Sequence, residues 1–93
     1  MDQVSRALQR RDRRAGRPVS ALADALQRRV GARVRELRAD RGLTQLRLAE
    51  RSGISRPSVA NVEVGRQNVS LRQLCALALA LDVGVEDLLA GDR

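Results

Sequence analysis

Several residue types are missing from this 93-residue chain, and each absence removes a class of function. There is no histidine and no aromatic residue, and there is a single cysteine. Most nucleophile–base pairs, most metal sites, internal disulfides and aromatic stacking surfaces are therefore excluded. We expect no catalytic residue, no metal site and no cofactor, and a protein that is not an enzyme.

Long apolar runs are also missing. No stretch approaches the roughly 18 residues that indicate a membrane span, and the N-terminus has charges where a signal peptide needs apolar residues. We therefore expect a soluble, cytoplasmic protein with no membrane partner. The single cysteine, Cys75, lies in the apolar stretch LRQLCALALAL and is expected to be a small buried side chain.

The chain is rich in basic residues: 18 basic residues and 11 acidic ones give a net charge of +7. Every basic residue is an arginine. Residues 1–29 contain eight arginines and three acids, net +5, and residues 30–68 contain eight arginines and four acids, net +4. Residues 69–93 contain two arginines and four acids, net −2. This polarity favours a nucleic-acid partner for the front of the chain.

The first 29 residues are expected to form a basic, helical extension to one small domain, residues 30–93. Their apolar stripe is thin, and Gly16-Arg17-Pro18 is expected to end a separate or frayed first helix. Ser20 then caps a helix that stops at Arg41-Gly42. Its apolar residues recur at helical spacing, namely Leu22, Leu26, Val30, Val34 and Leu37. A bend near Gly31 would make residues 18–41 two helices, and the sequence leaves both readings open.

The helix-capping residues, glycines and proline after residue 42 predict four short helices and no strand. Thr44 caps a helix over residues 45–51, Gly53 supplies a turn, and Ser55 caps a helix over residues 56–64 with Pro57 in its first turn. Ser70 caps a helix whose stripe is Leu71, Leu74, Leu77, Ala78 and Leu81, and a last helix contains Val85, Leu88 and Leu89. Two short helices joined by a tight glycine turn form the unit that inserts into DNA.

The stretch VRELRADRGLTQLRLAERSGISRPSVANVEVGRQNVSLRQLCALALALDVGVEDLL, residues 34–89, resembles the Cro/repressor helix-turn-helix family of the xenobiotic-response-element type, and the match covers about residues 30–89. The motifs LTQ, LA, GIS and E-x-G and the following leucine helix carry the resemblance. It implies an all-α, five-helix, lambda-repressor-like DNA-binding domain, here with an additional helical N-terminal extension. It also implies a transcriptional regulator that is associated with a bacterial nucleoid or encoded by a phage.

The resemblance also implies roles for individual residues. Arg38 and Glu63 would form a partly buried ion pair that sets the angle of the reading helix. The positions that read bases would be Arg56, Pro57 and Asn61, and those nearer phosphates would be Thr44, Gln45, Ser55, Ser58, Arg66 and Asn68. The chemistry agrees, because arginine pairs with guanine, asparagine with adenine, and an apolar ring with the thymine methyl group. Leu46 and Leu79 depart from the family by standing at usually polar positions, which suggests that the extension or a partner covers them.

The function expected from these observations is a repressor that binds an inverted repeat in double-stranded DNA as a homodimer. The acidic C-terminal segment is the expected dimer surface, through Leu81, Val85, Leu88 and Leu89. An alternative is an antitoxin or immunity protein that binds its protein partner through the extension and represses its own operon. A membrane or RNA binder is disfavoured, because the extension lacks large apolar anchors. The arginines Arg10, Arg11, Arg13 and Arg14 form either a solvated tail or an arm that contacts DNA.

Overall fold

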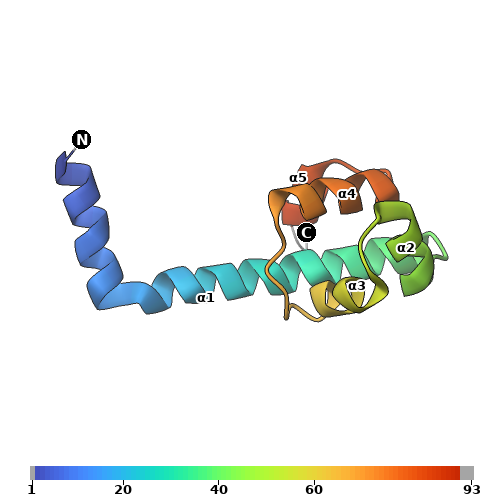
Figure 1. The fold of residues 1–93 in the computed structure, drawn as a ribbon, viewed down its shortest axis with the longest axis horizontal. Helices are drawn as coiled ribbons and strands as arrows, with labels where there is room; N and C mark the ends of the chain where they lie inside the picture. The colour runs from blue at the N-terminus through green and yellow to red at the C-terminus, as the bar shows by residue number, and fades with distance from the viewer. Residues whose placement is uncertain (1, 91–93) are drawn as a thin grey trace.

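Five α-helices make up the described part of the chain, which is the backbone of residues 2–90 and the side chains of residues 18–90. In this computed structural model the helices are α1 (Asp2–Asp40), α2 (Gln45–Ser52), α3 (Arg56–Glu63), α4 (Leu71–Leu81) and α5 (Val85–Ala90). No strand occurs in these residues, so the predicted all-α class is confirmed. The short helices gather around the C-terminal half of α1, and its N-terminal half extends away from them (Figure 1).

α1 is one helix of 39 residues, and the prediction of a separate first helix is wrong. Pro18 lies inside it, and Ser20 caps nothing. A proline removes one backbone hydrogen bond and clashes with the preceding turn, which bends a helix without always ending it. The N-terminal half of α1 is bent accordingly (Figure 1). Although α1 is long, none of the helices described here is apolar enough over a sufficient length to cross a membrane.

One hydrophobic core joins α1 to the four short helices. It contains Val30, Val34, Leu37, Leu48, Ala49, Val59, Val62, Leu74, Leu77, Ala78, Leu81 and Leu88. Leu81 and Leu88 have no exposed surface, so their expected place on a dimer surface is wrong. A charge introduced at Leu88 would lie in the core and not at an interface. Val85 is partly buried, and Leu89 is 44% exposed.

The outer face of α4 is also apolar. Cys75 is exposed, which contradicts its predicted burial, and Leu71 and Leu79 are each 81% exposed. These three residues are spaced by four and therefore lie on one side of the helix, while Leu74, Leu77, Ala78 and Leu81 line the side that faces the core. Because both faces of α4 are apolar, residue type alone does not distinguish them.

Three of the helices end in the same backbone motif. Leu43 N–H donates to the Arg38 carbonyl, Arg66 N–H to the Asn61 carbonyl and Val83 N–H to the Ala78 carbonyl, at 2.9–3.0 Å. These are the long bonds of Schellman motifs, which need a left-handed residue just after the helix. Gly42, Gly65 and Asp82 occupy that place, with φ angles of 65°, 74° and 58°.

Asp82→Gly is expected to raise the free energy of unfolding by about 1 kcal/mol, because the left-handed conformation is strained for a residue with a Cβ. Urea unfolding monitored by circular dichroism measures the change. Asp82→Asn is the matched control, since it removes the charge but keeps the Cβ, and it should change stability much less. A glycine variant that is less stable than the wild type would contradict this account.

Candidate nucleic-acid interface

α2 and α3 are short helices defined by their caps. The Thr44 hydroxyl accepts a hydrogen bond from Arg47 N–H at 3.0 Å, and the Ser55 hydroxyl accepts one from Ser58 N–H at 3.2 Å. Gly53 ends α2 with a φ of 74°, and Pro57 lies in the first turn of α3. The predicted caps and the tight turn between the two helices are confirmed.

α3 has one face in the core and one in solvent. Val59 and Val62 are at most 1% exposed and seat the helix on the rest of the domain. Arg56, Pro57 and Asn61 are exposed. The three side chains that the sequence assigns to base edges are therefore accessible together on the helix that the helix-turn-helix unit presents.

α3 and the turn that follows it approach α1 very closely at two glycines. A Cβ added at Gly31 would lie 2.0 Å from the carbonyl oxygen of Val62, and one added at Gly65 would lie 2.7 Å from Cγ of Arg28. The sequence suggested a bend at Gly31, whereas the residue serves this close approach. A lone glycine within an apolar helical stripe is the signal that could have indicated it, since a packing reason is usual there.

A buried ion pair holds the end of α3 to α1. Arg38 Nε donates to Glu63 Oε2 at 2.6 Å, and Arg38 Nη2 donates to Glu63 Oε1 at 3.0 Å. The Glu63 side chain is 2% exposed and that of Arg38 17%. This is the contact expected from the sequence.

Two further hydrogen bonds extend the pair to neighbouring segments. Arg38 Nη1 donates to the Leu43 carbonyl at 2.8 Å, and Gln45 Nε2 donates to Glu63 Oε1 at 3.0 Å. Hydrogen bonding to the Glu63 carboxylate, which accepts from Arg38, raises the pKa of Arg38 above its ordinary value. The network thus joins α1, the α1–α2 loop, α2 and α3, and it fixes the direction of α3 relative to the domain.

Several expected phosphate ligands already have partners within the domain. The amide of Gln45 donates to Glu63, and Asn68 Oδ1 accepts from Gln27 Nε2 at 2.7 Å. Ser55 Oγ donates to Ser58 Oγ at 2.9 Å. These side chains therefore have structural contacts in addition to any contact with DNA.

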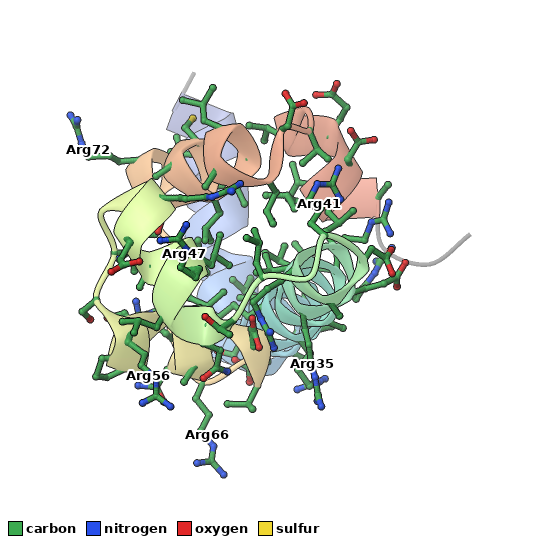
Figure 2. The ribbon with its side chains drawn as sticks, turned by 90° about the vertical axis from the view of Figure 1, so that its right-hand side faces the viewer. Arg35, Arg41, Arg47, Arg56, Arg66 and Arg72 are labelled. Carbon is green, nitrogen blue, oxygen red and sulfur yellow. The ribbon has the colours of Figure 1, made fainter. Side chains whose placement is uncertain are left out.

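Exposed arginines surround α3. Figure 2 shows Arg35, Arg56 and Arg66 projecting from the same side of the molecule, whereas Arg72 and Arg41 project elsewhere. Arg35 belongs to α1, and no signal in the sequence distinguishes it from the other arginines. Its position became visible only with the packing of α1 against α3. The side of the molecule that carries α3 is thus a cationic surface on which an anionic polymer can bind.

Comparison with known proteins identifies the fold. Residues 34–88 match the family model described as helix-turn-helix. The controller protein C.AhdI of a restriction-modification system from Aeromonas hydrophila superimposes with a TM-score of 0.67 at 45% identity, covering 69% of this chain and 97% of that one. The clp gene regulator ClgR from C. glutamicum superimposes with a TM-score of 0.66 at 38% identity, covering 70% of this chain and 84% of ClgR. The chain belongs to the Cro/C1-type helix-turn-helix family of DNA-binding transcriptional regulators.

Sequence relatives extend the comparison. The immunity repressor of Bacillus phage phi105 is 45% identical over 56 residues, which are 60% of this chain and 39% of the repressor. The transcriptional regulator DdrOP3 of Deinococcus deserti is 44% identical over 59 residues, 63% of this chain and 46% of the regulator. The chain thus spans less than half the length of these two relatives. One of these relatives is named as a repressor and the other as a transcriptional regulator.

Proposed function

We propose that the chain is a sequence-specific repressor that binds an inverted repeat in double-stranded DNA as a homodimer. α3 enters the major groove in this proposal. The observation that carries it is α3 itself, which is held by Glu63 from behind and exposes Arg56, Pro57 and Asn61 in front. The similarity to an immunity repressor supports the sign of the regulation.

The proposed base contacts follow from the shapes of the side chains. The guanidinium of Arg56 matches O6 and N7 of guanine, and the amide of Asn61 matches N6 and N7 of adenine. Pro57 presents an apolar ring to a thymine methyl group. Each contact requires α3 to keep its direction, which the Arg38–Glu63 pair supports.

The proposed phosphate contacts surround these positions. Arg66 lies beyond the end of α3 and therefore reaches the DNA backbone, not the base edges. Arg35 joins it because it projects from the same side (Figure 2). The N-termini of α2 and α3 offer backbone N–H groups, and Thr44, Gln45, Ser55 and Ser58 lie at these segments. Asn68 lies in the loop before α4, where its side chain accepts a hydrogen bond from Gln27 of α1.

Substitutions at the proposed base-reading positions and at a proposed phosphate-contacting position are expected to change DNA binding differently. Asn61→Ala or Arg56→Ala should lose about 1 to 3 kcal/mol of binding free energy on the operator and much less on unrelated DNA. Arg66→Ala should weaken binding to both and flatten the slope of log K against log salt by about one unit per half-site. Salt titrations of each variant on operator and scrambled duplexes measure both quantities. The DNA upstream of the chain's own gene is the first operator to test.

Arg41→Ala is the matched control, because this exposed arginine follows α1 and projects away from the side that carries α3 (Figure 2). It should leave the discrimination between operator and scrambled DNA unchanged. If Asn61→Ala loses the same affinity on both duplexes, Asn61 positions the protein and reads no base. The alternative role as an antitoxin or immunity protein stays a prediction, and co-purification with the product of an adjacent gene would test it.

A further inference from the structure

Outside the α3 surface, the protruding part of α1 carries an apolar stripe. Val19 and Leu22 are each 61% exposed, and Leu26 follows one turn later, partly buried. Their spacing of three and four residues places them on one side of the helix. The N-terminal part of α1 extends away from the other helices (Figure 1), and Leu26 is the residue of the stripe that reaches them.

The stripe leads into an apolar groove of about 290 Å³. The groove lies between α1, the loop that precedes α4, and the helices α4 and α5. Its apolar lining includes Ala23, Leu26, Val30, Leu71, Leu74 and Leu89. Because Leu26 belongs to both, the stripe and the groove form one continuous surface, and Leu71 and Leu89 add exposed apolar area at its far edge.

We propose that a second copy of the chain covers the stripe. The two α1 helices pack antiparallel, with Val19 of one copy opposite Leu22 of the other, so that the two stripes cover each other. The inference rests on the proposed function, because it supplies the interface of the proposed homodimer. It replaces the C-terminal surface expected from the sequence, since Leu81 and Leu88 are buried in the core.

The distribution of charge favours this direction over a parallel one. In the proposed register, residues 1–18 of one copy, net +4, lie on the same side of the crossing as residues 23–40 of the other, net +2. A parallel pairing would set residues 1–18 against the same +4 segment of the second copy and would repel more strongly.

The length of α1 gives an independent argument. If the helices cross between Val19 and Leu22, Gly31 lies about ten residues away, or about 16 Å at the rise of an α-helix. The two Gly31 positions, at which each α3 contacts α1, would then be about 32 Å apart. One turn of DNA separates half-sites by about 34 Å. This pairing therefore brings the two recognition helices to about the spacing that an inverted repeat requires.

The test compares Leu22→Asp with Leu79→Asp by sedimentation equilibrium without DNA. Both leucines are exposed in a single copy of the chain, so both variants should still fold and unfold cooperatively. Leu22→Asp should raise the dimer dissociation constant at least about 30-fold, because a carboxylate would be buried at the interface. Leu79→Asp, a change of the same kind outside the groove, should leave it unchanged. A wild-type monomer, an unaffected Leu22→Asp dimer, or a dimer broken by Leu79→Asp would overturn the proposal.

Cross-linking tests the register without a destabilising charge. Val19→Cys and Leu22→Cys chains, each also carrying Cys75→Ser, are mixed under mild oxidation. The antiparallel register predicts that the mixed disulfide exceeds both disulfides between identical chains. Equal or smaller yields of the mixed product would overturn the register.

DNA binding separates this interface from the proposed function. Leu22→Asp should bind a single half-site like the wild type but lose at least about 10-fold on the full inverted repeat, as expected when two linked contacts become one. If the wild type dimerises through α1 yet binds neither duplex, the interface stands and the proposed function fails. If Leu22→Asp leaves binding to both duplexes at the wild-type level, the interface does not serve DNA binding and the inference fails.

Discussion

Arg38→Ala is expected to lower the free energy of unfolding by about 3 kcal/mol or more, as for other broken buried pairs. The substitution removes both guanidinium hydrogen bonds to Glu63 and leaves that carboxylate, which is 2% exposed, with its hydrogen bond from Gln45. It also removes the donor to the Leu43 carbonyl. Thermal and urea unfolding of the purified variant measure the loss.

The chain contains a matched control for this prediction. Arg47 and Glu50 form an ion pair at 3.3 Å, but their side chains are 64% and 55% exposed. Arg47→Ala should therefore change stability by at most about 0.5 kcal/mol, because water screens an exposed pair. An Arg38→Ala protein as stable as Arg47→Ala would show that the buried pair does not hold the domain together.

Arg38→Lys refines the interpretation. Lysine keeps the positive charge but lacks the planar fork that contacts both oxygens of Glu63 and the Leu43 carbonyl. We expect stability between those of the wild type and Arg38→Ala. Recovery of full stability would mean that charge alone matters and that the geometry of the pair does not set the direction of α3.

The features that could be predicted correctly from the sequence depend on residues that are close together in the chain. Thr44, Ser55 and Ser70 are helix caps because a short side-chain oxygen bonds the nearby backbone N–H, and this depends on three or four neighbouring residues. Left-handed glycines at helix ends are similarly local. The helix-turn-helix unit consists largely of such signals, so its helices and its turn could be predicted.

The predictions that were wrong concern features that depend on contacts between distant segments of the chain. Periodicity indicates that a helix has an apolar stripe, but α4 is apolar on both faces, and only the packed domain shows that Leu81 is inside while Cys75 is outside. Likewise, proline and glycine in α1 suggested interruptions. α1 continues through Pro18 with a bend. Gly31 contacts the backbone of Val62 in α3, about thirty residues further along the chain.

The candidate site also contains some residues whose position could be predicted from the sequence and others whose position could not. Exposure of Arg56 and Asn61 on α3 could be expected, because both lie outside the apolar positions Val59 and Val62. The contribution of Arg35 could not, since it comes from α1 and reaches this side only through the packing of two helices (Figure 2). The internal partners of Gln45 and Asn68 are equally non-local.

Gly31→Ala is expected to be as destabilising as the loss of the ion pair, although helix propensity predicts the opposite sign. Alanine in a helix is favoured over glycine by about 1 kcal/mol. Here the new Cβ would lie 2.0 Å from the Val62 carbonyl oxygen and 3.0 Å from that of Glu63. Both are backbone atoms, so no side-chain rotation relieves the contact and α3 must move away from α1. Overpacking of this kind costs about 3 kcal/mol, at the upper end of its usual range.

The displacement of α3 has a second consequence, because the Val62–Glu63 segment that moves also carries the carboxylate bound to Arg38. Gly31→Ala should therefore lose operator affinity even at temperatures where the protein is fully folded, whereas Ala32→Gly, at the exposed neighbouring position, should cost about 1 kcal/mol of stability through propensity alone. Urea unfolding and operator binding at low temperature measure the two effects separately. A Gly31→Ala protein that is more stable than the wild type would mean that α1 and α3 have room for a methyl group, and that the close approach does not position the reading helix.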